Sequence, residues 1–166
     1  MGCLEAVCIS VEKGTVKQPV PSAVLREAWG IEGDAHAGDW HRQVSLLAGE
    51  SIDEVRRVMP ELDYGMFGEN LVTRGIDLAQ LAVGDRLLIG GQALLEITQV
   101  GKECHNGGCP IQKATGDCIM PREGIFCKVL AGGRIEPGSS VEHAVSIRLT
   151  SLPLGAPSSS LASSCS

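Results

Sequence analysis

The fold of this chain is best predicted by the stretch Arg86–Val100, which reads RLLIGGQALLEITQV. Two apolar segments, Arg86–Ile89 and Ala93–Val100, flank the sequence Gly90-Gly91-Gln92. Glycine adopts the positive φ values that tight turns require, so this arrangement is typical of a β-hairpin. The stretch therefore predicts two antiparallel strands that pair directly with each other.

Similar short apolar segments, separated by glycine and proline, recur on both sides of this hairpin. Aromatic residues make up only 3% of the chain, so the core must consist mainly of Val, Ile, Leu and Ala, which favours strands. Many short strands with close turn signals indicate a mostly antiparallel β-barrel or sandwich. The other expected strands are Leu4–Ser10, His41–Leu47, Ile125–Leu130 and Ser140–Leu149.

One or two short helices are expected beside the strands. Ser51 and Glu54 have the spacing of a capping box, which predicts a packing helix that ends at Pro60. A second short helix is expected within Ile111–Thr115. The apolar face of the first helix would consist of Ile52, Val55, Val58 and Met59.

Length and composition indicate one globular domain with a polar tail. The chain has 166 residues and a net charge of −6, with its basic residues scattered among acidic ones, so no nucleic-acid footprint is present. No apolar run has the length of a membrane span, and no signal peptide is evident, so we expect a cytoplasmic protein. We assign residues 1–150 to the domain and 151–166 to a disordered serine-rich tail.

Cysteines are concentrated in the segment Gly101–Cys127, which points to chemistry rather than packing. An odd total of seven cysteines in a reducing compartment favours thiols over a disulfide framework. Thiols near Lys102 and His105 tend toward the reactive thiolate form. Cys3, Cys8 and Cys127 lie in apolar runs and are most simply core residues.

A zinc site is one alternative for this segment. Cys104, His105, Cys109 and Cys118 provide the four sulfur and nitrogen donors of a tetrahedral site, although their spacing is irregular. Cys109 is otherwise interpreted as a second thiol that forms a transient disulfide or assists sulfur transfer.

Three blocks, taken in order, carry a family resemblance. They cover residues 30–47 (GIEGDAHAG followed by HRQVSLL), residues 68–87 (GENLVTRGIDL through VGDRL), and residues 96–133 (EITQ before Cys104, then GIFCKVL). In this order and at these separations the chain resembles the MOSC domain of molybdenum cofactor sulfurases, from about Leu4 to Val145. The resemblance implies a β-barrel like the small barrel domain of pyruvate kinase. The short chain is similar to stand-alone bacterial members.

The resemblance also implies site residues. The key cysteine of the family corresponds to Cys104, which would bind molybdenum or carry sulfur. Gly68-Glu69-Asn70 matches a polar turn of the family pocket, and His41-Arg42 matches its basic segment. Family members often carry Arg and Pro just before the cysteine, where this chain has Gly101-Lys102-Glu103.

The residues themselves leave alternatives open around this pocket. His41 and Arg42 either hydrogen-bond at a strand end or bind an anion, for which Arg42 offers a planar fork and Lys102 a point charge. Asp34 and His36 lie in a glycine-rich loop, where binding groups are commonly placed, and they join the expected pocket.

Three functional hypotheses follow. The first is a protein that binds and hands on molybdenum cofactor or its activated sulfur through Cys104, with cofactor biosynthesis proteins or a molybdoenzyme as partners. The second is a molybdenum-dependent oxidoreductase acting on N-hydroxylated compounds. It would need an external electron-donor protein, because the chain has no iron–sulfur, dinucleotide or haem motif. The third is a zinc-stabilised binding module without catalysis. The family is also associated with pyridoxal phosphate.

Overall fold

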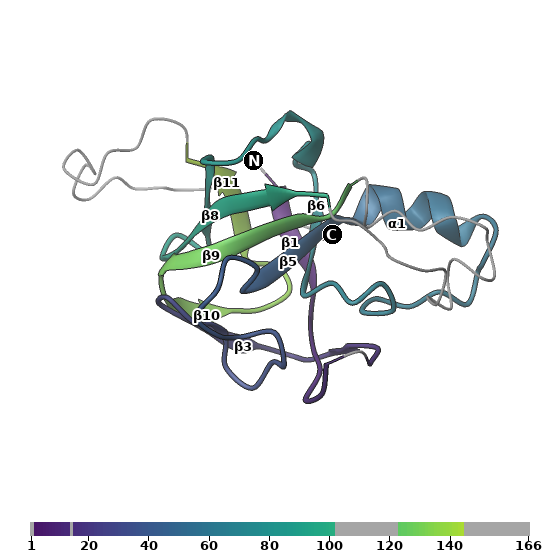
Figure 1. Ribbon diagram of the computed structural model, residues 1–166. Coiled ribbons are helices and arrows are strands. Elements are labelled where there is room, and N and C mark those ends of the chain that lie inside the picture. The colour runs from purple at the N-terminus through teal and green to yellow at the C-terminus, as the bar shows by residue number, and fades with distance from the viewer. Residues whose placement is uncertain (1, 14, 102–122, 145–166) are drawn as a thin grey trace.

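The computed structural model describes residues 2–13, 15–101 and 123–144. Most of its elements are short strands, and their order along the chain is shown by colour in Figure 1. The elements are β1 (Gly2–Ile9), β2 (Gln18–Pro19), β3 (Ala23–Arg26), β4 (Gly30–Ile31), β5 (Val44–Ala48), α1 (Gly49–Arg56), β6 (Leu71–Arg74), the 3-10 helix η1 (Leu78–Gln80), β7 (Arg86–Ile89), β8 (Ala93–Val100), β9 (Ile125–Ala131), β10 (Gly133–Ile135) and β11 (Ser140–His143).

Seven strands form a closed barrel. Neighbouring strands follow the order β11-β7-β8-β9-β5-β6-β1, and pairing of β1 with β11 closes the ring. Closure leaves none of these seven strands with an unpaired edge along its whole length. All neighbours in the ring are antiparallel except β5 and β6, which are parallel and are connected through α1. The expected mostly β barrel is therefore confirmed.

The hairpin that motivated this fold has the expected strands. Both β7 and β8 have the predicted bounds, and Ile89 pairs with Ala93 across the turn. Gly90 and Gly91 have φ values of +63° and +74°, which residues with a β-carbon rarely adopt. The two glycines therefore allow the chain to reverse between the strands.

The other strands agree with the sequence only in part. The expected strands correspond to β1, β5, β9 and β11, but β5 begins at Val44 rather than at His41. A separate sheet of β10, β3 and β4 was not expected, because strands of two to four residues are too short to show alternation. Residues beyond Ala144, and the expected helix at Ile111–Thr115, lie outside the described residues.

The helix lies where it was predicted, but the prediction that Ser51 and Glu54 form its capping box is wrong. Helix α1 begins after Ala48, which makes no side-chain cap hydrogen bond. The Ser51 hydroxyl instead donates to the Glu123 carboxylate, at the start of the segment that enters β9. The helix ends at Arg56, before Pro60. Figure 1 shows α1 projecting to one side of the barrel.

Apolar side chains form two clusters on opposite sides of the barrel wall. Strand β1 contributes to both, because successive side chains of a strand point to opposite faces. Leu4 and Val7 belong to the barrel interior, whereas Ala6 and Cys8 belong to an outer cluster that includes Ile52 of α1. A register shift between Leu4 and Ala6 accompanies the change of face.

The described cysteines are buried. Cys8 and Cys127 are free thiols at 0% exposure, and burial raises the pKa of Cys8 to about 12 and that of Cys127 still further. Such thiols do not form reactive thiolates near neutral pH, which agrees with their predicted role as core residues. Cys3 is also buried, but it is disulfide-bonded rather than the expected thiol.

Candidate functional site

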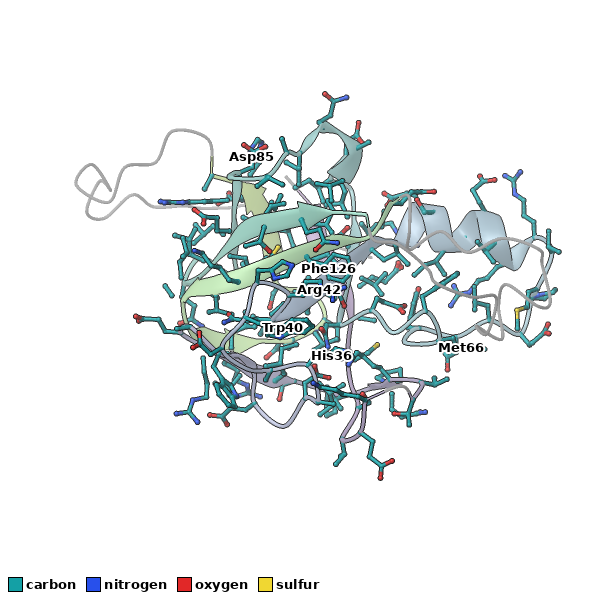
Figure 2. The ribbon with its side chains drawn as sticks, viewed as in Figure 1. His36, Trp40, Arg42, Met66, Asp85 and Phe126 are labelled. Atoms are coloured by element: carbon teal, nitrogen blue, oxygen red, sulfur yellow. The ribbon has the colours of Figure 1, made fainter. Side chains whose placement is uncertain are left out.

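The predicted pocket residues lie in two neighbouring places on the barrel. Asp34, His36, His41 and Arg42 lie in the loop that connects β4 to β5. Gly68-Glu69-Asn70 immediately precedes β6, which pairs with β5. Figure 2 shows His36, Trp40 and Arg42 grouped on one face of the molecule, with Phe126 beside Arg42.

A lysine that the sequence did not single out lies beneath this loop. Lys17 is only 1% exposed, and its Nζ lies 2.7 Å from Asp34 Oδ1, 3.2 Å from Ser10 Oγ and 2.9 Å from His36 Nδ1. An ammonium has three N–H donors, which matches the number of these polar neighbours. Asp34 also accepts backbone N–H groups from Ser10 and His36, at 3.1 and 3.0 Å. The buried ion pair therefore fixes the conformation of the loop.

Above this pair, an aromatic side chain connects His36 with Arg42. The indole of Trp40 stacks on the His36 ring with 6.4 Å between centroids and 15° between planes, and its Nε1 donates to the His36 carbonyl. The guanidinium carbon of Arg42 lies 4.8 Å from the Trp40 centroid and 5.7 Å from that of Phe126. The loop thus holds a cation between two aromatic rings.

Arg42 lacks the hydrogen bonds that its burial calls for. Its Nε is buried and has no hydrogen-bond partner among the described residues. A buried donor without an acceptor costs about 1–3 kcal/mol, and more when the group is charged. An anionic ligand that accepts from the guanidinium would remove this cost, so Arg42 has the environment of an anion-binding residue.

The neighbouring His41 has a different environment. Its side chain is exposed, and its Nε2 lies 2.9 Å from Gln99 Oε1 on β8. The Thr98 hydroxyl donates to the His41 carbonyl. These contacts give His41 the strand-end hydrogen bonding considered from the sequence, whereas Arg42 has no such contact among the described residues.

Glu69 is a buried carboxyl that binds its own loop. It is 0% exposed, and its two oxygens accept the backbone N–H groups of Gly65 and Phe67 at 2.8 and 3.0 Å. Burial raises the pKa of Glu69 to about 7, although these hydrogen bonds and Lys17 act in the opposite direction. Glu69 therefore holds the loop before β6 and titrates near neutral pH.

Asn70, which precedes β6, connects β5 and β1 through its side chain. Its Oδ1 accepts from the backbone N–H of Ser45 at 3.0 Å and from the Ser45 hydroxyl at 3.2 Å, while its Nδ2 donates to the Cys8 carbonyl. Gly68 has a φ of +84°, and a β-carbon there would meet nothing within 4 Å, so backbone conformation rather than space favours glycine. Glu69 and Asn70 of the expected polar turn thus make internal hydrogen bonds that hold the segment before β6 against β5 and β1.

Five predicted residues lie outside the described residues. They are Lys102, Cys104, His105, Cys109 and Cys118. The positions flanking them are described, and the Gly101 N–H donates to the Gly124 carbonyl at 2.7 Å. The flanking residues Gly101 and Gly124 therefore lie side by side, and the Gly101 carbonyl accepts from Gln99 Nε2 at 2.7 Å, while Gln99 also contacts His41.

Metal ligands and cavities give further information about the site. Within residues 2–13, 15–101 and 123–144, no group of three or more His, Cys, Asp or Glu side chains could hold a metal ion. A cavity of about 570 Å³ lies between the start of α1 and residues 75–79, and its wall includes Glu50, Asp77 and Glu123. These carboxylates would repel a phosphate.

Sequence reasoning missed Lys17, Ser10, Trp40 and Phe126. A lone lysine between Val16 and Gln18 has no pattern that distinguishes it from a surface lysine. Trp40 offered a usable signal, because aromatic residues are rare in this chain and this one adjoins His41-Arg42.

The MOSC domain model matches residues 33–142, which include the Asp34–Arg42 loop, Glu69 and Asn70. The chain belongs to the MOSC domain family. In the part of the chain that the structure describes, no helix is long and apolar enough to cross a membrane.

Relatives of this MOSC protein include solved structures of the same fold. The YuaD protein from Bacillus subtilis is 22% identical, with a TM-score of 0.70, covering 84% of this chain and 93% of that chain. YiiM from Geobacillus stearothermophilus is 18% identical, with a TM-score of 0.64, covering 87% of this chain and 75% of that chain.

Two curated relatives are longer than the matched region. The uncharacterized protein YflK from Bacillus subtilis (strain 168) is 25% identical over 145 residues, which span 80% of this chain and 63% of YflK. A protein named "Reductase" from Gibberella moniliformis is 26% identical over 151 residues, spanning 79% of this chain and 27% of that protein. The chain therefore spans less than two thirds of either relative.

Proposed function

We propose that this MOSC protein binds molybdenum cofactor and transfers the cofactor or its activated sulfur to a partner protein. The observation that carries the proposal is the environment of Arg42. It is a half-buried cation beside Trp40 and Phe126, and its Nε has no hydrogen-bond partner in the part of the chain that the structure describes. This environment fits the phosphate of a pterin cofactor, and membership of the family supports that choice of ligand.

Each described residue has a separate part in this proposal. Arg42 would bind the phosphate through charge-assisted hydrogen bonds, and Trp40 would exclude water from one side of its guanidinium. Lys17 and Asp34 hold the loop that positions both residues. Glu69 and Asn70 form the supporting wall through their bonds to backbone groups.

Cys104 is the proposed sulfur ligand or persulfide carrier. When bound, the cofactor supplies a molybdenum centre held by sulfur donors, for which a thiolate is a suitable additional ligand. Gly101, three residues before Cys104 in the sequence, accepts a hydrogen bond from Gln99, which contacts His41. Because Arg42 follows His41, this arrangement of the described residues supports a site shared by Cys104 and Arg42.

A molybdenum-dependent oxidoreductase that acts on N-hydroxylated compounds is the second candidate. The match to the Gibberella protein named "Reductase" favours it, although the chain spans only 27% of that protein. This activity would use the same Cys104 and Arg42 and would need an external electron-donor protein. For the carrier, the proposed partners are cofactor biosynthesis proteins or a molybdoenzyme.

The test compares cofactor loading in two matched cysteine variants. Cys104→Ser replaces a soft sulfur donor with a poor ligand, so purified protein from a molybdenum-replete host should lose its molybdenum while its melting temperature stays unchanged. Cys8→Ser is the control, because Cys8 is a buried thiol at 0% exposure and should keep its molybdenum. Full molybdenum content in folded Cys104→Ser protein would refute the role of Cys104.

A further inference from the structure

The contact between Lys17 and His36 determines where the imidazole carries its proton. Lys17 Nζ lies 2.9 Å from His36 Nδ1, and it lies 2.7 Å from Asp34 Oδ1. Lys17 thus forms an ion pair with Asp34, and an ammonium only donates hydrogen bonds. His36 Nδ1 must therefore present a lone pair to Lys17.

We propose that Lys17 is a positioning residue that holds His36 in its neutral form with the proton on Nε2. In this form His36 is a hydrogen-bond donor through Nε2, and it cannot bind a metal through that nitrogen without losing the proton.

The position of Asp34 supports the same assignment. A carboxylate that accepts from Nδ1 would place the proton on Nδ1, which is the common arrangement for an oriented histidine. Here the nearest Asp34 oxygen, Oδ2, lies 4.0 Å from Nδ1, too far for a hydrogen bond, and it accepts the His36 backbone N–H instead. Lysine thus occupies the place that a carboxylate would otherwise take.

The surrounding charges also favour a neutral imidazole. Lys17 faces Nδ1 directly, and Arg42 and Lys13 lie over the Trp40 ring, with Lys13 Nζ 5.8 Å from its centroid. Among the residues that the structure describes, Asp34 faces His36 with a negative charge, and it is already paired with Lys17. A second proton on His36 would break its bond to Lys17 and add a positive charge beside the Lys17 ammonium.

The consequence concerns the proposed anion site and rests on the proposed function. His36 stacks on Trp40, on whose ring Arg42 also lies, so a donor at Nε2 suits an anionic oxygen at this face. His36 would then contribute to recognition of an anionic oxygen and not to metal coordination.

Imidazole ¹⁵N NMR on the full chain tests the assignment without requiring any cofactor. The chain has four histidines, so a His36→Gln variant identifies the signals of His36. At neutral pH we expect the shift of an unprotonated nitrogen for Nδ1 and of a protonated nitrogen for Nε2. A protonated Nδ1 in the wild-type protein would overturn the proposal.

Two lysine variants separate positioning from general stability. Lys17→Gln retains donors for Asp34 and Ser10 but removes the ammonium, and it should shift His36 measurably toward protonation at Nδ1. Lys13→Met is the matched control, since Lys13 is exposed and makes no hydrogen bond to His36 among the described contacts, and it should leave the tautomer unchanged. An unchanged tautomer in folded Lys17→Gln protein would also overturn the proposal.

The results of this test and of the test of the proposed function can be distinguished. A protein that shows the Nε2–H form but contains no molybdenum would refute the proposed function alone. A protein that contains molybdenum while His36 is protonated at Nδ1 would refute the present inference alone.

Discussion

Glu69 is expected to make the stability of this protein fall as pH rises from about 4.5 to about 7. Burial raises its pKa in the folded protein from 4.5 to about 7, against the opposing effect of its backbone hydrogen bonds. Between these values the folded protein retains a proton that the unfolded chain has released. The free energy of unfolding therefore decreases with pH across this range and is insensitive to Glu69 above it.

The size of the effect follows from the difference between the two pKa values. Each pKa unit corresponds to 1.36 kcal/mol, so the raised pKa of Glu69 is worth about 3 kcal/mol across the window. Glu69→Gln removes the titration but leaves the N–H of Gly65 or Phe67 facing an amide NH₂, at a cost of about 1–3 kcal/mol. The variant should be less stable than the wild-type protein at pH 4.5, and the gap should narrow by about 3 kcal/mol near pH 7.5.

Urea unfolding of both proteins at several pH values measures this gap. Taking the difference between variant and wild type removes the contribution of the other titrating groups. Glu61→Gln, at an exposed carboxylate, is the matched control and should show a gap that does not depend on pH. A gap for Glu69→Gln that stays constant from pH 4.5 to 7.5 would mean that the backbone hydrogen bonds and Lys17 outweigh burial.

Three other changes have expected outcomes. Cys127→Ser should lower the free energy of unfolding by about 1–3 kcal/mol, because it places a hydroxyl in the barrel interior. A loss of this size in calorimetry, together with an unchanged molybdenum content, would confirm a purely structural role. Arg42→Gln, alone or with Lys102→Gln, should weaken binding of the phosphate-bearing pterin by about 1.5–3 kcal/mol per lost charged hydrogen bond and should reduce the salt dependence of binding. Arg57→Gln, at an exposed arginine, is the control and should change neither quantity. If Arg42→Gln and wild-type protein bind with equal affinity at both low and high salt, Arg42 is not part of the site. Truncation after Thr150 should leave the melting temperature unchanged, because the removed residues carry no charge and little apolar surface, and a drop of several degrees would show that they pack on the domain.

The elements of the barrel that could be predicted from the sequence are those whose local residue pattern is sufficient to define them. The β7–β8 hairpin was predicted correctly because Gly90 and Gly91 mark its turn and the flanking strands are long enough to recognise. The start of α1 was wrong because the Ser51 hydroxyl bonds to Glu123, a contact 72 residues away that overrides local capping. Strands β2, β3, β4 and β10 have two to four residues, and such segments depend on their pairing partners rather than on their own pattern.

The candidate site was predicted through its loop but not through its support. Asp34, His36 and Arg42 were predicted, and the structure brings them together around Trp40. Lys17 was missed because a buried lysine can be recognised only when its three acceptors are placed around it. The role of Cys104 remains a prediction, since it lies outside the described residues.

The most direct test of the account is elemental and pterin analysis of the intact protein, purified from a molybdenum-replete host. We predict molybdenum and pterin in equal, near-stoichiometric amounts, with the pterin detected by its fluorescence after oxidation. Near-stoichiometric zinc without pterin would contradict the account and would support the zinc site of Cys104, His105, Cys109 and Cys118 instead.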